Sequence, residues 1–173
     1  MVETAPPFER PSRILFVCSG NLCRSPMAEG LFKSMAAKYG LEEIESGSAG
    51  TLARQDIPAT EHTRQVAAEG GVDLSGHQSR KLTAELITKS DLILTMELEH
   101  IHELLGVDRG AYGKAFLLSA FSPDRMSMIE VQDPYACDIE TYRECYCTIE
   151  AMVRNILEAL AKWDTFMAGI KAD

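Results

Sequence analysis

A short polar loop between an apolar run and a helix start most constrains the fold of this chain. Residues 14–17 are apolar, the run stops at Cys18, and Arg24 begins an expected helix after five intervening residues. A thiol and a guanidinium therefore lie at the two ends of a loop of about phosphate size. Because the positive end of a helix stabilises an oxyanion, this pattern predicts a phosphate cradle.

Strands and helices alternate along the rest of the sequence. We expect strands over 12–17, 43–48, 91–96 and 114–120, helices over 26–39, 59–69, 82–89, 97–105 and 139–166, and an irregular stretch over 123–134. Alternation of this kind predicts a single-domain α/β fold, a three-layer sandwich with a central four-stranded parallel sheet flanked by helices. Active sites of such sheets lie at the carboxyl ends of the strands, where Cys18 is expected.

The length and the apolar content favour one domain in a soluble compartment. The chain has 173 residues and 46% of them are hydrophobic, which is enough for a substantial core. We expect residues 1–11 to be a disordered N-terminal tail and residues 12–168 to form the domain. No apolar run approaches the roughly 20 residues of a membrane span, and residues 1–10 lack the apolar centre of a signal peptide. These features predict a cytoplasmic protein without a membrane partner.

The net charge and the number of cysteines exclude several classes of function. The formal net charge of −9 argues against general nucleic-acid binding, which needs a basic face. A phosphate site in so acidic a chain must be made attractive locally, by Arg24, backbone N–H groups and a helix end. The odd count of five cysteines argues against a disulfide framework and favours a reducing compartment. Their spacing fits no zinc pattern, so we expect no metal and no cofactor.

The residue types in the loop suit attack by a thiolate on a phosphate ester. Gly20 and Asn21 tolerate the backbone dihedrals that converging N–H groups demand. Arg24 adds a planar, permanently charged fork for two phosphate oxygens. A helix N-terminus and a neighbouring cation favour the thiolate form of Cys18, and Ser25 could donate its hydroxyl to that sulfur. The alternative for an isolated cysteine at a strand end is a buried structural thiol.

At this point the sequence resembles a known family. Residues 18–29 look like the signature of the low-molecular-weight protein tyrosine phosphatases, and residues 48–51, 77–80, 91–97 and 133–135 are similar to other segments of that family. The resemblance covers roughly residues 12–160. It implies a phosphoric monoester hydrolase whose partner is a phosphotyrosine-containing protein or peptide.

The resemblance also implies roles for individual residues. Cys18 would be the nucleophile, Arg24 the phosphate clamp and Asp133 the general acid. The other residues expected to bind the phosphate or stabilise the thiolate are Ser19, Gly20, Asn21, Leu22, Cys23 and Ser25. In the family, a cysteine at the position of Cys23 can form a disulfide with the nucleophile under oxidation and so protect it.

The residues themselves support Asp133 less strongly than they support Cys18. A general acid must be carried by a segment that reaches the ester oxygen, and the irregular stretch before the last helix is suitable. An aspartate before a proline is, however, more commonly a turn residue. Tyr135 could form one aromatic wall of the site. Leu52 would form the opposite wall, where the family often has an aromatic residue, so efficiency on phosphotyrosine is in question.

Three alternatives stay open. Protein arginine phosphatases share the fold, but the corresponding loop of that family has a second threonine at the position of Leu22. A leucine at this position offers no hydroxyl to a phosphorylated guanidinium. Thioredoxin-coupled arsenate reductases need a resolving cysteine pair near residues 90–110, and this chain has no cysteine there. A non-catalytic phosphoprotein-binding module would not need both Cys18 and Asp133.

The remaining histidines and cysteines receive no catalytic role. His77 could orient a loop near the sheet edge, and His62, His100 and His102 are expected to be surface or helix-face residues. Trp163 is expected to be a packing residue. Cys137, Cys145 and Cys147 have no counterpart in the family that assigns them a function.

Overall fold

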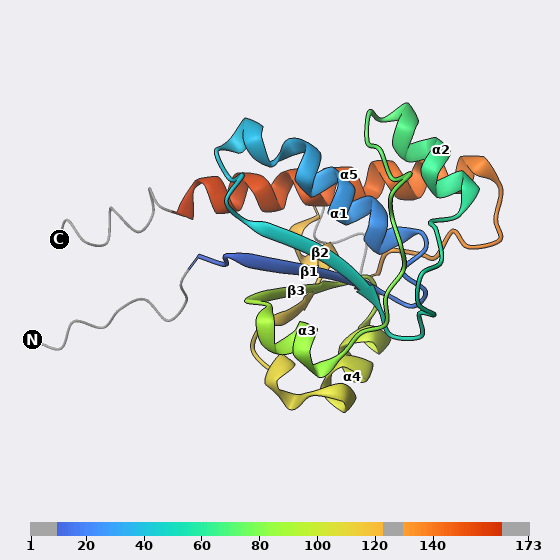
Figure 1. The fold of residues 1–173 in the computed structure, drawn as a ribbon. Coiled ribbons are helices and arrows are strands. Elements are labelled where there is room, and N and C mark those ends of the chain that lie inside the picture. Colours follow the sequence, from blue (N-terminus) through green and yellow to red (C-terminus); the bar gives the residue numbers. More distant parts are fainter. Residues whose placement is uncertain (1–9, 123–129, 164–173) are drawn as a thin grey trace, which may run out of the picture.

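The computed structural model describes residues 10–122 and 130–163 and places a four-stranded parallel sheet at the centre of the molecule (Figure 1). Its strands are β1 (Arg13–Cys18), β2 (Glu45–Gly50), β3 (Leu92–Thr95) and β4 (Ala115–Leu117), in the order β2-β1-β3-β4. All three pairings are parallel. Since β1 is a central strand, the end of β1 lies between the ends of β2 and β3.

Helices cover both faces of the sheet, which confirms the expected three-layer α/β sandwich. On one face lie α1 (Arg24–Ala36), α2 (Glu61–Glu69) and α5 (Ile139–Ala161); on the other lie α3 (Ala84–Lys89) and α4 (Leu98–Val107) (Figure 1). Short 3₁₀ turns span Ala37–Tyr39, Arg109–Ala111 and Leu118–Phe121. None of the helices in the described ranges could cross a bilayer.

The strict alternation of side chains along β1 divides the core into two layers. Ile14 and Phe16 are fully buried in the cluster formed with α1 and α5. Leu15 and Val17 point to the other face and pack in the smaller cluster with Ile87. Burial on both faces fixes the register of β1, and therefore fixes where the strand ends and the polar loop begins.

Several helices and strands begin or end at other residues than predicted, because local contacts determine where they begin and end. The helix predicted over 59–69 begins at Glu61, because the Thr60 hydroxyl accepts a hydrogen bond from the Thr63 N–H group and caps it. The helix predicted to end before Gly106 continues to Val107. The strand predicted over 114–120 has only three residues, and the 3₁₀ turn that follows it buries Leu118.

Parts of three predictions lie outside the described residues. They are residues 1–9 of the expected tail, residues 123–129 of the irregular stretch, and residues 164–168 at the end of the domain, including the last turn of the helix predicted to reach residue 166. In the described part, Trp163 is half-buried beside an apolar hollow at the edge of β4.

Candidate active site

The loop from Cys18 to Ser25, called the Cys–Arg loop here, connects the end of β1 to the start of α1. The Cys18 side chain is buried, and its Sγ atom accepts a hydrogen bond from the Asn21 N–H group at 3.3 Å. The Ser25 hydroxyl lies 3.0 Å from the same sulfur. Both contacts stabilise negative charge on sulfur, as the predicted role of Cys18 requires.

Asn21 holds the backbone of this loop in shape. It has a positive φ of 55° and is completely buried. Its side-chain amide donates to the hydroxyls of Ser25 and Ser48, each at 2.9 Å, and its Oδ1 accepts from the Arg80 N–H group at 2.9 Å. The Asn21 carbonyl accepts a hydrogen bond from His77 Nε2 at 2.8 Å. His77 thus orients a loop, as predicted, and the strained residue is held from three segments of the chain.

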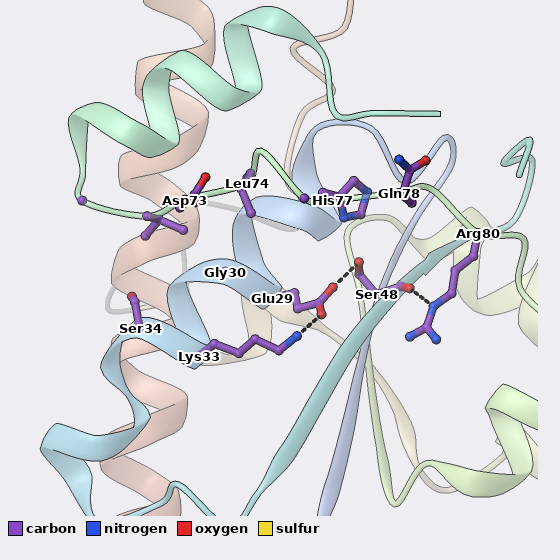
Figure 2. Close-up of a pocket in the computed structure, with 13 residues that line it drawn as sticks. Glu29, Gly30, Lys33, Ser34, Ser48, Asp73, Leu74, His77, Gln78 and Arg80 are labelled. Carbon is purple, nitrogen blue, oxygen red and sulfur yellow. Dashed lines mark hydrogen bonds and ion pairs between the residues drawn. The ribbon is translucent and has the colours of Figure 1, made fainter. Parts of the chain in front are cut away.

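Ser48, in the second half of β2, accepts a hydrogen bond from Asn21 and also lines a hollow between α1 and residues 71–80 (Figure 2). Its hydroxyl donates to the Glu29 carboxylate, which also pairs with Lys33 one helical turn along α1. Its carbonyl accepts from Arg80 Nε at 2.7 Å. The hollow has a volume of about 660 Å³ between α1 and residues 71–80. Ser48 was not among the residues predicted to form the site.

The guanidinium of Arg24 is buried at the base of the loop and contacts two carboxylates. Nη1 donates to Glu97 and, at 2.8 Å, to the Val131 carbonyl, whereas Nη2 donates to Asp133 Oδ2 at 2.7 Å. Burial alone would lower the pKa of Arg24, but the hydrogen bond to Glu97 and the nearby charges of Cys18 and Asp133 raise it above its ordinary value. Arg24 is therefore a fixed cation despite its burial.

Glu97 is a site residue that sequence analysis did not identify. It lies just after β3, the strand beside β1, and its carboxylate anchors one side of the Arg24 fork. The signal available in the sequence was an acidic residue directly after a strongly apolar strand. Only the order of the strands brings that residue next to Arg24.

Asp133 reaches the site from a position 109 residues beyond Arg24 in the chain. Its Oδ1 accepts a hydrogen bond from the Tyr135 N–H group at 3.1 Å, while its Oδ2 contacts Arg24. The Asp133 side chain is 40% exposed and so can exchange protons with solvent. The structure therefore places the predicted acid beside the predicted clamp.

The predicted residues meet around one cavity. Its volume is about 220 Å³, and its lining residues are Cys18, Ser19, Gly20, Leu22, Cys23, Leu52, Asp133 and Tyr135. Leu52 is 71% exposed and Tyr135 is 60% exposed, so both can contact a ligand that enters from solvent. Asn21, Arg24 and Ser25 are buried next to this lining.

His100 lies on α4, in agreement with the helix-face alternative of its prediction, but it is buried rather than on the surface. His100 is 2% exposed, its Nε2 lies 2.9 Å from the Ser19 hydroxyl, and its Nδ1 accepts from the Glu97 N–H group at 3.1 Å. The third residue of a helix can cap it by accepting a hydrogen bond from the N–H group of the residue just before the helix. The signal available in the sequence was therefore a histidine three residues after Glu97. His102 is exposed, and His62 is half-buried with its ring edge against Tyr142.

The five cysteines are all free thiols, in different surroundings. Cys23 is buried, with its Sγ 3.5 Å from the Tyr142 hydroxyl, and burial raises the pKa of its thiol. Burial also raises the pKa of Cys145 to about 12. Cys137 and Cys147 are exposed. Across residues 10–122 and 130–163, no group of histidines, cysteines or carboxylates is placed to hold a metal ion.

The chain is similar to known proteins over most of its length. Residues 13–165 match the family described as "Low molecular weight phosphotyrosine protein phosphatase". The low molecular weight protein-tyrosine-phosphatase Etp of Escherichia coli K12 is 36% identical over 149 residues, covering 86% of this chain and 95% of Etp. A protein-arginine-phosphatase of Bacillus subtilis is 37% identical over 150 residues, covering 86% of this chain and 97% of the relative.

A solved structure shows the same fold. The crystal structure of the Erwinia amylovora tyrosine phosphatase AmsI aligns with a TM-score of 0.78 and 34% sequence identity, covering 86% of this chain and 93% of AmsI. The family match spans both the Cys–Arg loop and Asp133, the two parts of the cavity that are far apart in sequence. The chain therefore belongs to the low molecular weight phosphotyrosine protein phosphatase family.

Proposed function

We propose that this protein hydrolyses aryl phosphate monoesters, in particular phosphotyrosine in proteins or peptides, through a cysteinyl-phosphate intermediate. The observation that carries this proposal is that Cys18 and Asp133 line one cavity that opens to solvent, while Arg24, buried behind that lining, contacts Asp133. A thiol alone could be structural, and an arginine alone could bind an anion. A thiol, a fixed cation and a solvent-accessible carboxyl group at one cavity are the components of a covalent phosphoryl transfer.

In the first step, the Cys18 thiolate attacks phosphorus while the bond from phosphorus to the aryl oxygen breaks. Arg24 and the backbone N–H groups of the Cys–Arg loop hold the three non-bridging oxygens as charge develops on them. Arg24 Nε is buried and has no hydrogen-bond partner in the described part of the chain, so it is one donor available to an oxygen. Asp133 gives its proton to the departing aryl oxygen.

In the second step, water attacks phosphorus and the bond from phosphorus to sulfur breaks. Asp133, now ionised, accepts a proton from that water. The electron pair returns to Cys18, whose thiolate is stabilised by the Ser25 hydroxyl and the Asn21 N–H group. Inorganic phosphate leaves and the enzyme is regenerated.

The ion pair between Arg24 and Asp133 describes the state of the site before substrate binds. A phosphate dianion is held by the same guanidinium, so its binding competes with the Asp133 carboxylate. A neutral, protonated Asp133 does not repel the dianion. Once the dianion occupies the guanidinium, the Asp133 carboxyl group is released from Arg24 for the proton transfer of the first step.

The surroundings of the cavity favour phosphotyrosine over phosphoarginine. Leu22 lies in the lining and presents only methyl groups, and Leu52 and Tyr135 flank the opening with exposed apolar surface. A flat phenyl ring can pack between such walls without leaving a polar group unpaired. A phosphorylated guanidinium would bring N–H donors to a leucine that cannot accept them.

The first prediction compares three substrates in parallel. We expect turnover of a phosphotyrosine peptide to exceed that of a phosphoarginine peptide by about tenfold in kcat/KM, and no reduction of arsenate with thioredoxin. Leu22→Thr is the matched variant, because it adds one hydroxyl and should shift the ratio toward phosphoarginine. Colorimetric phosphate release and thioredoxin oxidation measure the outcomes. Preferential hydrolysis of phosphoarginine by the wild-type protein would reject the aryl ester assignment.

Measurements of phosphate release with and without a reductant test whether Cys23 protects Cys18 against oxidation. Hydrogen peroxide oxidises a cysteine thiolate to a sulfenic acid, and a neighbouring thiol displaces water from it to form a disulfide. We propose that Cys18 and Cys23 form such a disulfide under oxidation. We also propose that the protein is located in the cytoplasm, where thiols are normally kept reduced. Without Cys23, excess hydrogen peroxide oxidises the Cys18 sulfenic acid further to a sulfinic acid, which dithiothreitol does not reduce. Activity lost to excess peroxide should therefore return with dithiothreitol in the wild type but not in Cys23→Ser.

The third prediction concerns the leaving group. Asp133→Asn should lower kcat by about 10²-fold on phosphotyrosine, whose phenolate leaves poorly without a proton, and much less on p-nitrophenyl phosphate. KM should not rise, because the neutral amide no longer competes with phosphate for Arg24. Steady-state kinetics on a series of aryl phosphates measure the dependence. An equal loss on good and poor leaving groups would show that Asp133 is not the proton donor.

A further inference from the structure

Ser19 lies in the Cys–Arg loop, and its hydroxyl contacts one residue outside the loop, His100, and one within it, Arg24. Its Oγ lies 2.9 Å from Nε2 of the buried His100 and 3.4 Å from Nη2 of Arg24. It also lines the cavity next to Cys18. A serine hydroxyl at such a place can turn toward several acceptors unless its neighbours remove that freedom.

The tautomer of His100 settles which atom donates in this contact. The Glu97 N–H group donates to Nδ1 of His100 at 3.1 Å, so Nδ1 carries a lone pair and no hydrogen. A neutral imidazole with a bare Nδ1 carries its hydrogen on Nε2. His100 must therefore donate to the Ser19 oxygen, and that oxygen is an acceptor.

Charge and burial keep the imidazole in this form. Burial and the nearby Arg24 cation lower the pKa of His100, whereas the carboxylates of Glu97, Glu103 and Asp133 oppose that effect without reversing it. The neutral ring is therefore the stable form at neutral pH. Protonation at low pH would place a hydrogen on Nδ1, directly against the Glu97 N–H group.

The hydroxyl hydrogen of Ser19 must point away from its two neighbours, His100 and Arg24. Its oxygen accepts one hydrogen bond from His100 Nε2 and a longer one from Arg24 Nη2, and neither group can accept a hydrogen in return. We propose that His100 is a positioning residue that turns the Ser19 hydroxyl into the cavity, as a side-chain donor to the bound phosphoryl group. This inference rests on the proposed phosphatase function.

The competing explanation is that His100 only caps α4. The two roles use different ring atoms, Nδ1 for the cap and Nε2 for Ser19, so they can be separated. Asparagine in place of His100 can still accept from the Glu97 N–H group, but its shorter side chain has no atom at the position of Nε2. His100→Asn therefore removes the contact with Ser19 and retains the cap.

The test is a double-mutant cycle on the full chain, with p-nitrophenyl phosphate as substrate. We expect Ser19→Ala and His100→Asn each to lower kcat/KM by about tenfold, the usual effect of losing one hydrogen bond to a charged group. The double variant should show no further loss, because both changes remove the same donor. Ser19→Thr, which retains the hydroxyl, should stay within about threefold of wild type. His102→Asn, on the same helix but exposed, is the matched control.

Three results would overturn the inference. The first is a fall in kcat/KM of the double variant equal to the product of the two single falls. The second is an unchanged kcat/KM for Ser19→Ala, and the third is a fall for His102→Asn equal to that for His100→Asn. If His100→Asn did not fold, the ¹⁵N chemical shifts of the wild-type imidazole still decide the matter. A neutral ring with hydrogen on Nε2 at pH 7 supports the inference, and hydrogen on Nδ1 contradicts it.

A measurement without turnover separates this inference from the proposed function. We expect Ser19→Ala to weaken the binding of inorganic phosphate by about tenfold in titration calorimetry, whether or not any ester is hydrolysed. Equal phosphate affinity in Ser19→Ala and wild type would overturn the role of the hydroxyl. Absence of ester hydrolysis by the wild type, with this difference in phosphate affinity intact, would refute the proposed function alone.

Discussion

Cys18→Ser is expected to lower kcat for aryl phosphate hydrolysis by about 10⁴-fold or more, the largest effect of any single substitution in this protein. The thiolate of Cys18 is both the nucleophile and the leaving group of the intermediate. A serine hydroxyl at the same place remains protonated at neutral pH, because no general base contacts this position among the described residues. The Ser25 and Asn21 donors stabilise an anion that serine does not form.

The binding of phosphate separates loss of chemistry from loss of structure. Cys18→Ser retains Arg24 and the backbone of the loop, so titration calorimetry should give an affinity for inorganic phosphate close to that of wild type. Cys147→Ser, an exposed cysteine on α5, is the matched control and should retain full activity. Hydrolysis at the wild-type rate by Cys18→Ser would refute the cysteinyl-phosphate mechanism.

Arg24→Lys should reduce kcat/KM by about 10³-fold although the charge is conserved. The guanidinium contacts Glu97 and Val131 through Nη1, so the phosphate can bind at Nε, which has no partner among the described residues, and at Nη2, where it competes with Asp133. A lysine ammonium is a single point and cannot hold these partners and two phosphate oxygens together. The loss should be in kcat more than in KM, since the fork follows charge that develops in the transition state.

Thermal unfolding must accompany that measurement, because Arg24 is also a buried structural cation. Arg143→Lys is the control, since Arg143 pairs with Glu69 and Glu140 on the surface and lies outside the cavity. It should leave the kinetics unchanged. If Arg24→Lys retained activity within tenfold of wild type while remaining folded, the phosphate would be held by the backbone and the helix end instead.

The part of the site that could be predicted from the residues themselves is the part formed by one continuous segment of the sequence. Cys18, Arg24 and the small residues between them lie in one segment, and the chemistry of a strand, loop and helix start is local. Asp133 was supported mainly by the family resemblance, since an aspartate before a proline has a common use in turns. Its approach to Arg24 depends on long-range contacts, among them those of Val131 with Arg24 and Met96.

Glu97, His100 and Ser48 could not be placed in the same way. Each is an ordinary residue in its local sequence, and each joins the site only because β2 and β3 flank β1. Strand order depends on packing across the whole domain, which hydrophobic periodicity does not encode. The shortened β4 has the same origin, because a short apolar run is compatible with a strand or with the buried 3₁₀ turn that follows residue 117.

The central position of β1 also has a consequence for how the protein folds. The loop at its end is supported by Ser48, His77, Glu97 and Asp133, which come from four successive, widely separated parts of the chain. Contacts of such high sequence separation form late, after the cost of closing long loops has been met. A chain still being synthesised carries Cys18 and Arg24 long before it carries Asp133. Enzymatic activity is thus a property that only the completed fold can have, and its recovery on refolding reports the last long-range contacts to form.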